Sequence, residues 1–119
     1  MNSFRELTVW QRSLELVAEV YKLTKKFPKE EVFGLTSQMR RAAASIPANI
    51  AEGYARKHRA EYVQFLRIAF GSGAELESHI AVAQKLEFVS LVDSRKAAGL
   101  LDETMRMLNK LISTLVAKP

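Results

Sequence analysis

Residues 36–56 have the sequence TSQMRRAAASIPANIAEGYAR, and this stretch decides the fold. Its larger apolar side chains recur every three or four residues, which is the spacing of one face of an α-helix. These residues are Met39, Ala43, Ile46, Ile50 and Tyr54. Thr36 is suited to cap the N-terminus of such a helix. Pro47 lies in the middle and removes one backbone hydrogen bond, so we expect a helix that is bent at this residue.

The other sides of this helix carry unusually little charge. Between Gln38 and Ala55 the only charged residues are Arg40, Arg41 and Glu52. A row of alanines lies roughly opposite the apolar face and would let another helix backbone approach closely: Ala44, Ala48, Ala51 and Ala55. A helix of this kind is normally covered on more than one side. Because three other helices of so short a chain can scarcely surround it, the sequence predicts that a second copy covers part of it.

Three further helices are predicted from the same periodicity. The first spans about 7–26, the third about 59–87, and the last begins at a cap, Ser90 or Asp93, and frays at the chain end. In the first, the apolar face is expected to contain Leu7, Trp10, Leu14, Val17 and Tyr21. In the third, Gly71-Ser72-Gly73 is expected to mark a close helix crossing. Four amphipathic helices with short connections predict an all-α, antiparallel, up-down four-helix bundle, with residues 1–119 as one domain.

Composition argues against most chemistry. The 119-residue chain contains no cysteine and two histidines, so thiol catalysis and thiolate metal sites are excluded. The nearest approach to a metal site is Glu75 with His79, accompanied by Glu77, and we interpret it as a surface pair one helical turn apart. The sequence therefore predicts no enzyme activity, catalytic residue, metal or cofactor. No apolar run approaches the length of a membrane span and no secretory signal is recognisable, so a cytoplasmic location without membrane association is expected.

The positive charge is concentrated in one part of the chain. The net charge is +5, and residues 36–67 contain six basic and two acidic side chains, or +4. Basic groups clustered on one surface are typical of nucleic-acid binding, whereas scattered ones only keep a protein in solution. The candidate nucleic-acid-binding residues are Arg40, Arg56, Lys57, Arg59 and Arg67, with Tyr54 and Tyr62 beside them.

A polar stripe runs between the apolar and alanine rows of the second helix. Arg41, Ser45, Asn49 and Glu52 belong to it, and Glu75 on the third helix is available to pair with them. Buried charges must be paired, since an isolated ion out of water costs several kcal/mol. These residues are predicted to form a structural network or a subunit contact, with a ligand pocket as the alternative.

Residues 38–54, QMRRAAASIPANIAEGY, resemble the signature of the 23S rRNA intervening-sequence protein family. The stretches LTVWQ at 7–11, FPKEE at 27–31 and FGLT at 33–36 are similar to the family's opening. The resemblance implies a bacterial four-helix bundle that assembles into a homopentameric ring, with no catalytic residues. A related group, the accessory proteins of diversity-generating retroelements, binds nucleic acid and a reverse transcriptase.

Two functions from different classes are therefore expected. The first is a non-enzymatic oligomer that binds RNA or DNA through its basic surface, with a reverse transcriptase as a further partner. The alternative is a protein–protein interaction scaffold in which the same charge only maintains solubility.

Overall fold

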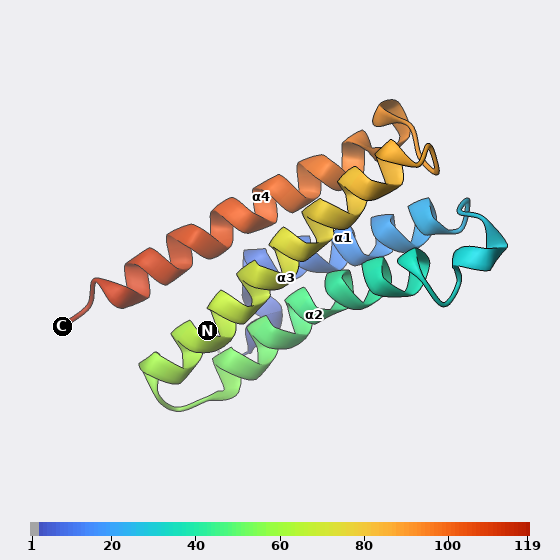
Figure 1. Ribbon diagram of the computed structural model, residues 1–119. Coiled ribbons are helices and arrows are strands. Elements are labelled where there is room, and N and C mark those ends of the chain that lie inside the picture. The colour runs from blue at the N-terminus through green and yellow to red at the C-terminus, as the bar shows by residue number, and fades with distance from the viewer. Residues whose placement is uncertain (1–2) are drawn as a thin grey trace.

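The computed structural model describes residues 3–119, and these are almost entirely helical (Figure 1). The four long helices are α1 (Thr8–Thr24), α2 (Leu35–Ala55), α3 (Arg59–Lys85) and α4 (Leu91–Val116). Two short 3-10 helices, η1 (Phe4–Glu6) and η2 (Lys29–Glu31), precede α1 and α2. No strand occurs within residues 3–119. The predicted all-α four-helix fold is confirmed.

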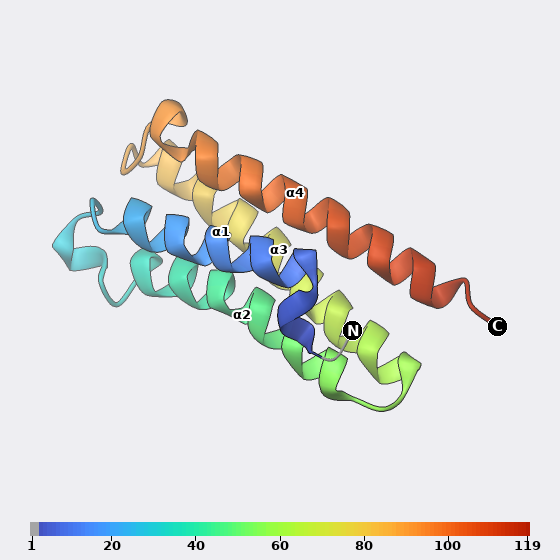
Figure 2. The same cartoon turned by 180° about the vertical axis from the view of Figure 1, so that it is seen from behind.

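Consecutive helices run in opposite directions, as Figures 1 and 2 show from the two sides. Each helix packs against two others, in the cyclic order α1, α2, α3, α4. The bundle is elongated, with principal extents of 49 × 23 × 20 Å. The α1–α2 and α3–α4 connections lie at one end and the α2–α3 connection at the other (Figure 1). The surface formed by α1 and α2, called here the α1/α2 face, is therefore opposite the surface formed by α3 and α4, the α3/α4 face.

The core follows the predicted faces of α2 and α3. Met39, Ile46 and Ile50 of α2 are fully buried, and so are Leu66 and Leu76 of α3. Both helices keep the spacing of three and four along their buried side, as the sequence predicted. Pro47 is also buried, and α2 continues through it as one helix.

The predicted face of α1 is right only in part, since Leu7, Trp10 and Val17 pack partly buried against the core but its other two residues are exposed. Leu14 and Tyr21 are 42% and 41% exposed, whereas Leu16 and Val20 of a neighbouring stripe are fully buried. That stripe also contains Ser13 and Thr24, whose hydroxyl groups donate hydrogen bonds to the carbonyls of Trp10 and Val20. Because each hydroxyl is satisfied within its own helix, it can be buried in the core at little cost.

The helix ends agree with the sequence except at the start of α2. Ser90 caps α4, with its hydroxyl accepting a hydrogen bond from the N–H of Asp93 at 2.9 Å. Thr36 does not cap α2: it is buried inside the helix, and Gly34 occupies the cap position. The carboxylate of Glu31 on η2 accepts the N–H of Leu35 at 3.2 Å and takes over the role predicted for Thr36.

Two glycines allow helices to approach closely. A Cβ added at Gly53 of α2 would lie 2.7 Å from the Cβ of Phe65 on α3. A Cβ at Gly73 of α3 would collide with the sulfur of Met105 on α4, which confirms the predicted close crossing at Gly73. Gly71, by contrast, is exposed, with no atom within 4 Å of such a Cβ. In the described part of the chain no helix is sufficiently long and apolar to span a bilayer.

Candidate nucleic-acid interface

The basic side chains at the α2–α3 connection do not all have the same freedom. Arg56 ends α2, and its guanidinium lies 3.8 Å from the Glu52 carboxylate and 3.7 Å from that of Glu61. It also lies over the Phe65 ring, 4.8 Å from the centroid. Two carboxylates already lie beside its charge, so Arg56 offers less uncompensated positive charge to a phosphate than the other basic residues near this connection.

The other three candidate residues near this connection are exposed and have no Asp or Glu partner among residues 3–119. Lys57 and Arg59 lie in and just after the connection, and Arg67 follows about two turns along α3. Arg59 donates a hydrogen bond to the backbone oxygen of Pro119 at 2.7 Å. These three residues are called here the basic end of the bundle. Their positive charge is accessible to a polyanion approaching along the bundle axis.

The two tyrosines beside the basic end pack on each other. The rings of Tyr54 and Tyr62 meet edge to face, with centroids 5.9 Å apart and planes at 88°. Both residues are half-buried. Burial raises the pKa of Tyr62 above its ordinary value of about 10, and the neighbouring Tyr54 adds to this effect. Because the two rings are half-buried against each other, little ring surface is available for stacking with a base. We therefore expect charge at the basic end to contribute more to nucleic-acid binding than stacking does.

Arg40 does not lie with the other four candidates. It is sixteen residues before Arg56, or about 24 Å along the helix. Its guanidinium lies over the Tyr21 ring at 4.5 Å, and its Nε donates to the Thr24 hydroxyl at 2.8 Å. The five candidate residues are thus divided between the two ends of the bundle.

The polar stripe of α2 is not one network within the chain. Asn49 donates to the carbonyl and hydroxyl oxygens of Ser45, at 2.8 and 2.9 Å, and the Ser45 and Ser72 hydroxyls are 2.9 Å apart. Glu75 instead lies 3.2 Å from His79 on its own helix, as the sequence predicted. Arg41 has no hydrogen bond or ion pair within residues 3–119. The predicted single network does not form within residues 3–119: Glu52 and Glu75 pair one turn along the chain, Arg41 has no partner, and Ser45 is the stripe residue that bonds across to α3. Arg41, Ser45 and Glu75 do line one surface pocket of about 340 Å³ together with Ser72.

The alanine row of α2 is not covered by the chain's own helices. Ala44, Ala48 and Ala55 are exposed and Ala51 is half-buried. Tyr21 of α1 borders the same surface, since it lines a pocket of about 270 Å³ together with Ala44 and Arg41. The α1/α2 face therefore presents apolar and small side chains to the outside, as expected for a helix that one chain cannot enclose.

Residues 5–110 match the family described as 23S rRNA-intervening sequence protein. The chain belongs to this family. The matched range includes the basic end, the polar stripe and the alanine row. No curated protein matches the chain.

A family structure supports the fold. The chain is similar to a crystal structure of a protein with unknown function from the S23 ribosomal protein family of Bacteroides thetaiotaomicron VPI-5482. The TM-score is 0.79 at 24% sequence identity, covering 88% of this chain and 98% of that chain. At this identity the likeness establishes the shared bundle and leaves function open.

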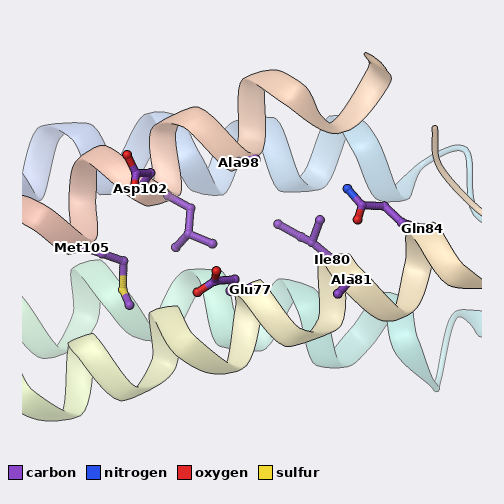
Figure 3. Close-up of a pocket in the computed structure, with 8 residues that line it drawn as sticks. Glu77, Ile80, Ala81, Gln84, Ala98, Asp102 and Met105 are labelled. Atoms are coloured by element: carbon purple, nitrogen blue, oxygen red, sulfur yellow. The ribbon is translucent and has the colours of Figure 1, made fainter. Parts of the chain in front are cut away.

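Sequence reasoning missed a groove of about 440 Å³ on the α3/α4 face of this family member (Figure 3). Its lining from α3 includes Glu77, Ile80 and Ala81, and its lining from α4 includes Leu101 and Met105. Glu77 projects from α3 into the space between the two helices (Figure 3). The small residues Ala81 and Ala98 opposite each other were the available signal, because small side chains leave room between packed helices.

The acidic and histidine side chains of the described chain do not form a metal-binding cluster: no three of them within residues 3–119 gather in a way that could hold a metal ion. His79 has Glu75 as its neighbour at 3.2 Å, and that pair lies on one helix. The candidate binding surfaces are therefore the basic end, the uncovered α1/α2 face and the α3/α4 groove.

Proposed function

We propose that this member of the family is a non-enzymatic, oligomeric helical-bundle protein that binds RNA or DNA through its basic end. The observation that carries the proposal is the exposure of Lys57, Arg59 and Arg67 without an Asp or Glu partner in the described chain. Contacts to phosphates supply most of the affinity of non-specific nucleic-acid binding. The family description, which refers to an intervening sequence in 23S rRNA, makes RNA the first ligand to test. The proposal takes the protein to be cytoplasmic.

Assembly would strengthen this binding. The uncovered alanine row favours self-association, and the family resemblance makes a pentameric ring the form proposed. Each copy would present its own basic end, so one long nucleic acid could contact several copies at once. Linked contacts of this kind raise overall affinity well beyond that of a single site.

The test is a titration of fluorescently labelled structured RNA, followed by anisotropy at several salt concentrations. The variant Lys57→Gln/Arg59→Gln/Arg67→Gln neutralises the basic end. Each lost phosphate contact reduces the slope of log affinity against log salt by about 0.7–0.9. We therefore expect a slope about 2–3 units smaller for each bound copy, with weaker binding at low salt.

The matched control is Lys22→Gln/Lys26→Gln/Lys85→Gln, which removes the same charge from exposed residues at the opposite end of the bundle. It should retain most of the affinity. Absence of binding by the wild-type protein at low salt would refute the proposal. Equal losses in the two triple variants would show that the basic end has no special role.

A protein–protein scaffold is the second candidate, and a specific observation favours it. Phe33, at the α1–α2 connection, is 93% exposed, and Leu91 and Val92, at the α3–α4 connection, are 73% and 67% exposed. Large apolar side chains exposed together at one end of a bundle are typical of protein contacts. A protein partner, such as a reverse transcriptase, that stays bound after nuclease treatment and is lost in Phe33→Ser would favour this function.

A further inference from the structure

The groove on the α3/α4 face combines an apolar floor with two carboxylates, of which Asp102 is paired with Arg106 at 2.6 Å and Glu77 is not paired in the described chain. Ile80 and Leu101 are buried beneath it, and Met105 is half-buried at its side. Glu77 projects into it and has no hydrogen bond or ion pair within residues 3–119 (Figure 3). A guanidinium suits such a place, because its planar group is weakly hydrated, packs on apolar surface and pairs with a carboxylate through two parallel hydrogen bonds.

The chain's own arginines indicate which residue could enter the groove of another copy. In the described chain Arg41, Arg67 and Arg95 have no hydrogen bond, ion pair or ring contact. Arg67 and Arg95 belong to α3 and α4, the helices that form the groove. Arg41 belongs to α2 and lies at the outer edge of the α1/α2 face: it lines one pocket with Tyr21 and Ala44, and another with Ser72 and Glu75 of α3.

Arg41 and Glu77 also lie at nearly the same height along the bundle axis. The hydrogen bond between Ser45 and Ser72 places these two residues level with each other on antiparallel helices. Because the helices are antiparallel, the residue four before Ser45 is level with the residue four after Ser72. Arg41 is therefore level with position 76. Glu77 is one residue further, about 1.5 Å along the axis. Rotation about an axis parallel to the bundle changes no height, so it can bring Arg41 of one copy to Glu77 of the next.

We propose that copies associate head to tail, with Arg41 of one copy inserted into the α3/α4 groove of the next and paired there with Glu77. The inference rests on the oligomeric part of the proposed function and names the surfaces that meet. Two different surfaces on opposite sides of one chain form a heterologous interface, which closes into a ring when the rotation fits. The flat, uncharged alanine row beside Arg41 lets the next bundle approach closely. The α1/α4 side carries cross-helix ion pairs, Arg12 with Glu103 at 3.4 Å and Lys96 with Glu19 at 3.7 Å, and is left facing solvent.

The experiment is a charge exchange followed by sedimentation velocity and native mass spectrometry. Arg41→Glu and Glu77→Arg are made singly and together in the full chain. Each single variant places like charges opposite each other, and truncating or reversing one member of an enclosed pair typically weakens association about 30-fold or more. We expect each single variant to shift to lower mass at micromolar concentration. The double variant should return to the mass of the wild-type oligomer.

Glu15→Arg is the matched control, since it makes the same charge change on the α1/α4 side, where Glu15 pairs with Arg12. It should keep the wild-type mass. Circular dichroism of every variant separates loss of association from loss of folding, and all three positions are exposed.

The outcomes separate this inference from the proposed function. A wild-type protein that is monomeric at micromolar concentration overturns the oligomer and this inference together. A wild-type oligomer that both single variants leave intact overturns only the pairing of Arg41 with Glu77. Disruption by the single variants without recovery in the double variant also overturns it, because the two side chains would then act in separate contacts.

Discussion

Replacing Gly53 and Gly71 by alanine tests how closely α2 and α3 pack. Both glycines lie inside helices and neither has a positive φ, so alanine fits the backbone at both positions. Alanine favours a helix over glycine by about 1 kcal/mol. At Gly71 the added Cβ meets nothing within 4 Å, and the variant should gain that amount in free energy of unfolding.

At Gly53 the same gain is opposed by a collision. The added Cβ would lie 2.7 Å from the Phe65 Cβ and 3.2 Å from the Tyr62 carbonyl oxygen, and both of these atoms are held by the α3 backbone. Carbon atoms normally stay about 3.5–4.0 Å apart. The two helices must therefore separate, and overpacking of this kind costs about 1–3 kcal/mol. The net expectation for Gly53→Ala is a loss of about 1 kcal/mol.

Urea denaturation followed by circular dichroism measures both changes. The two variants should fall on opposite sides of the wild type, and a thermal scan should show shifts of about 4 °C in each direction. The chain concentration must be equal in all samples, because self-association stabilises the folded state. Stabilisation of both variants by the same amount would refute the close packing of α2 on α3 at Gly53.

Three further changes test other parts of the structure. Ala48→Glu places a charge in the exposed alanine row and should lower the sedimentation mass of the oligomer without unfolding the bundle; an unchanged mass would show that this row is not an interface. Ser90→Ala removes the hydroxyl that caps α4 and should lower the free energy of unfolding by about 1 kcal/mol in urea, whereas the exposed Ser113→Ala should cost much less. The pKa of Tyr62 is raised in the folded protein, so the stabilisation linked to its neutral form is complete below about pH 10 and is lost as the pH rises through the folded pKa. Spectroscopic titration should show that one of the three tyrosines ionises later than free tyrosine, and Tyr62→Phe should remove this step.

Helical periodicity was a good guide to α2 and α3 and a poor one to α1. On α2 and α3 one stripe is clearly more apolar than the others, and it is the buried one. On α1 the stripe through Leu14 and Tyr21 is as regular as the stripe through Leu16 and Val20, and it is more aromatic. The choice between them depends on Ser13 and Thr24, which bury their hydroxyls by bonding to their own helix. The spacing of apolar residues does not show that a polar side chain can be buried when it bonds to its own helix.

The candidate site was predicted less well than the fold, for a physical reason. Arg56, Lys57 and Arg59 are close in sequence, so their proximity in space follows directly. The partner of a long charged side chain depends on which rotamer it adopts: the sequence offered Glu75 both His79 on its own helix and the polar stripe of α2, and in the structure it pairs with His79. The groove around Glu77 depends on how far apart α3 and α4 lie. This distance cannot be predicted from the residue pattern of either helix alone.

The close packing of α2 on α3 also bears on the order in which the chain folds. Gly53 and the pair Ser45–Ser72 join helices separated by only a three-residue turn, so closing this hairpin loses little chain entropy. Contacts between α1 and α4 join the two ends of the sequence and must wait until the whole chain is available. The central hairpin is therefore the natural nucleus, and the outer two helices complete the bundle around it.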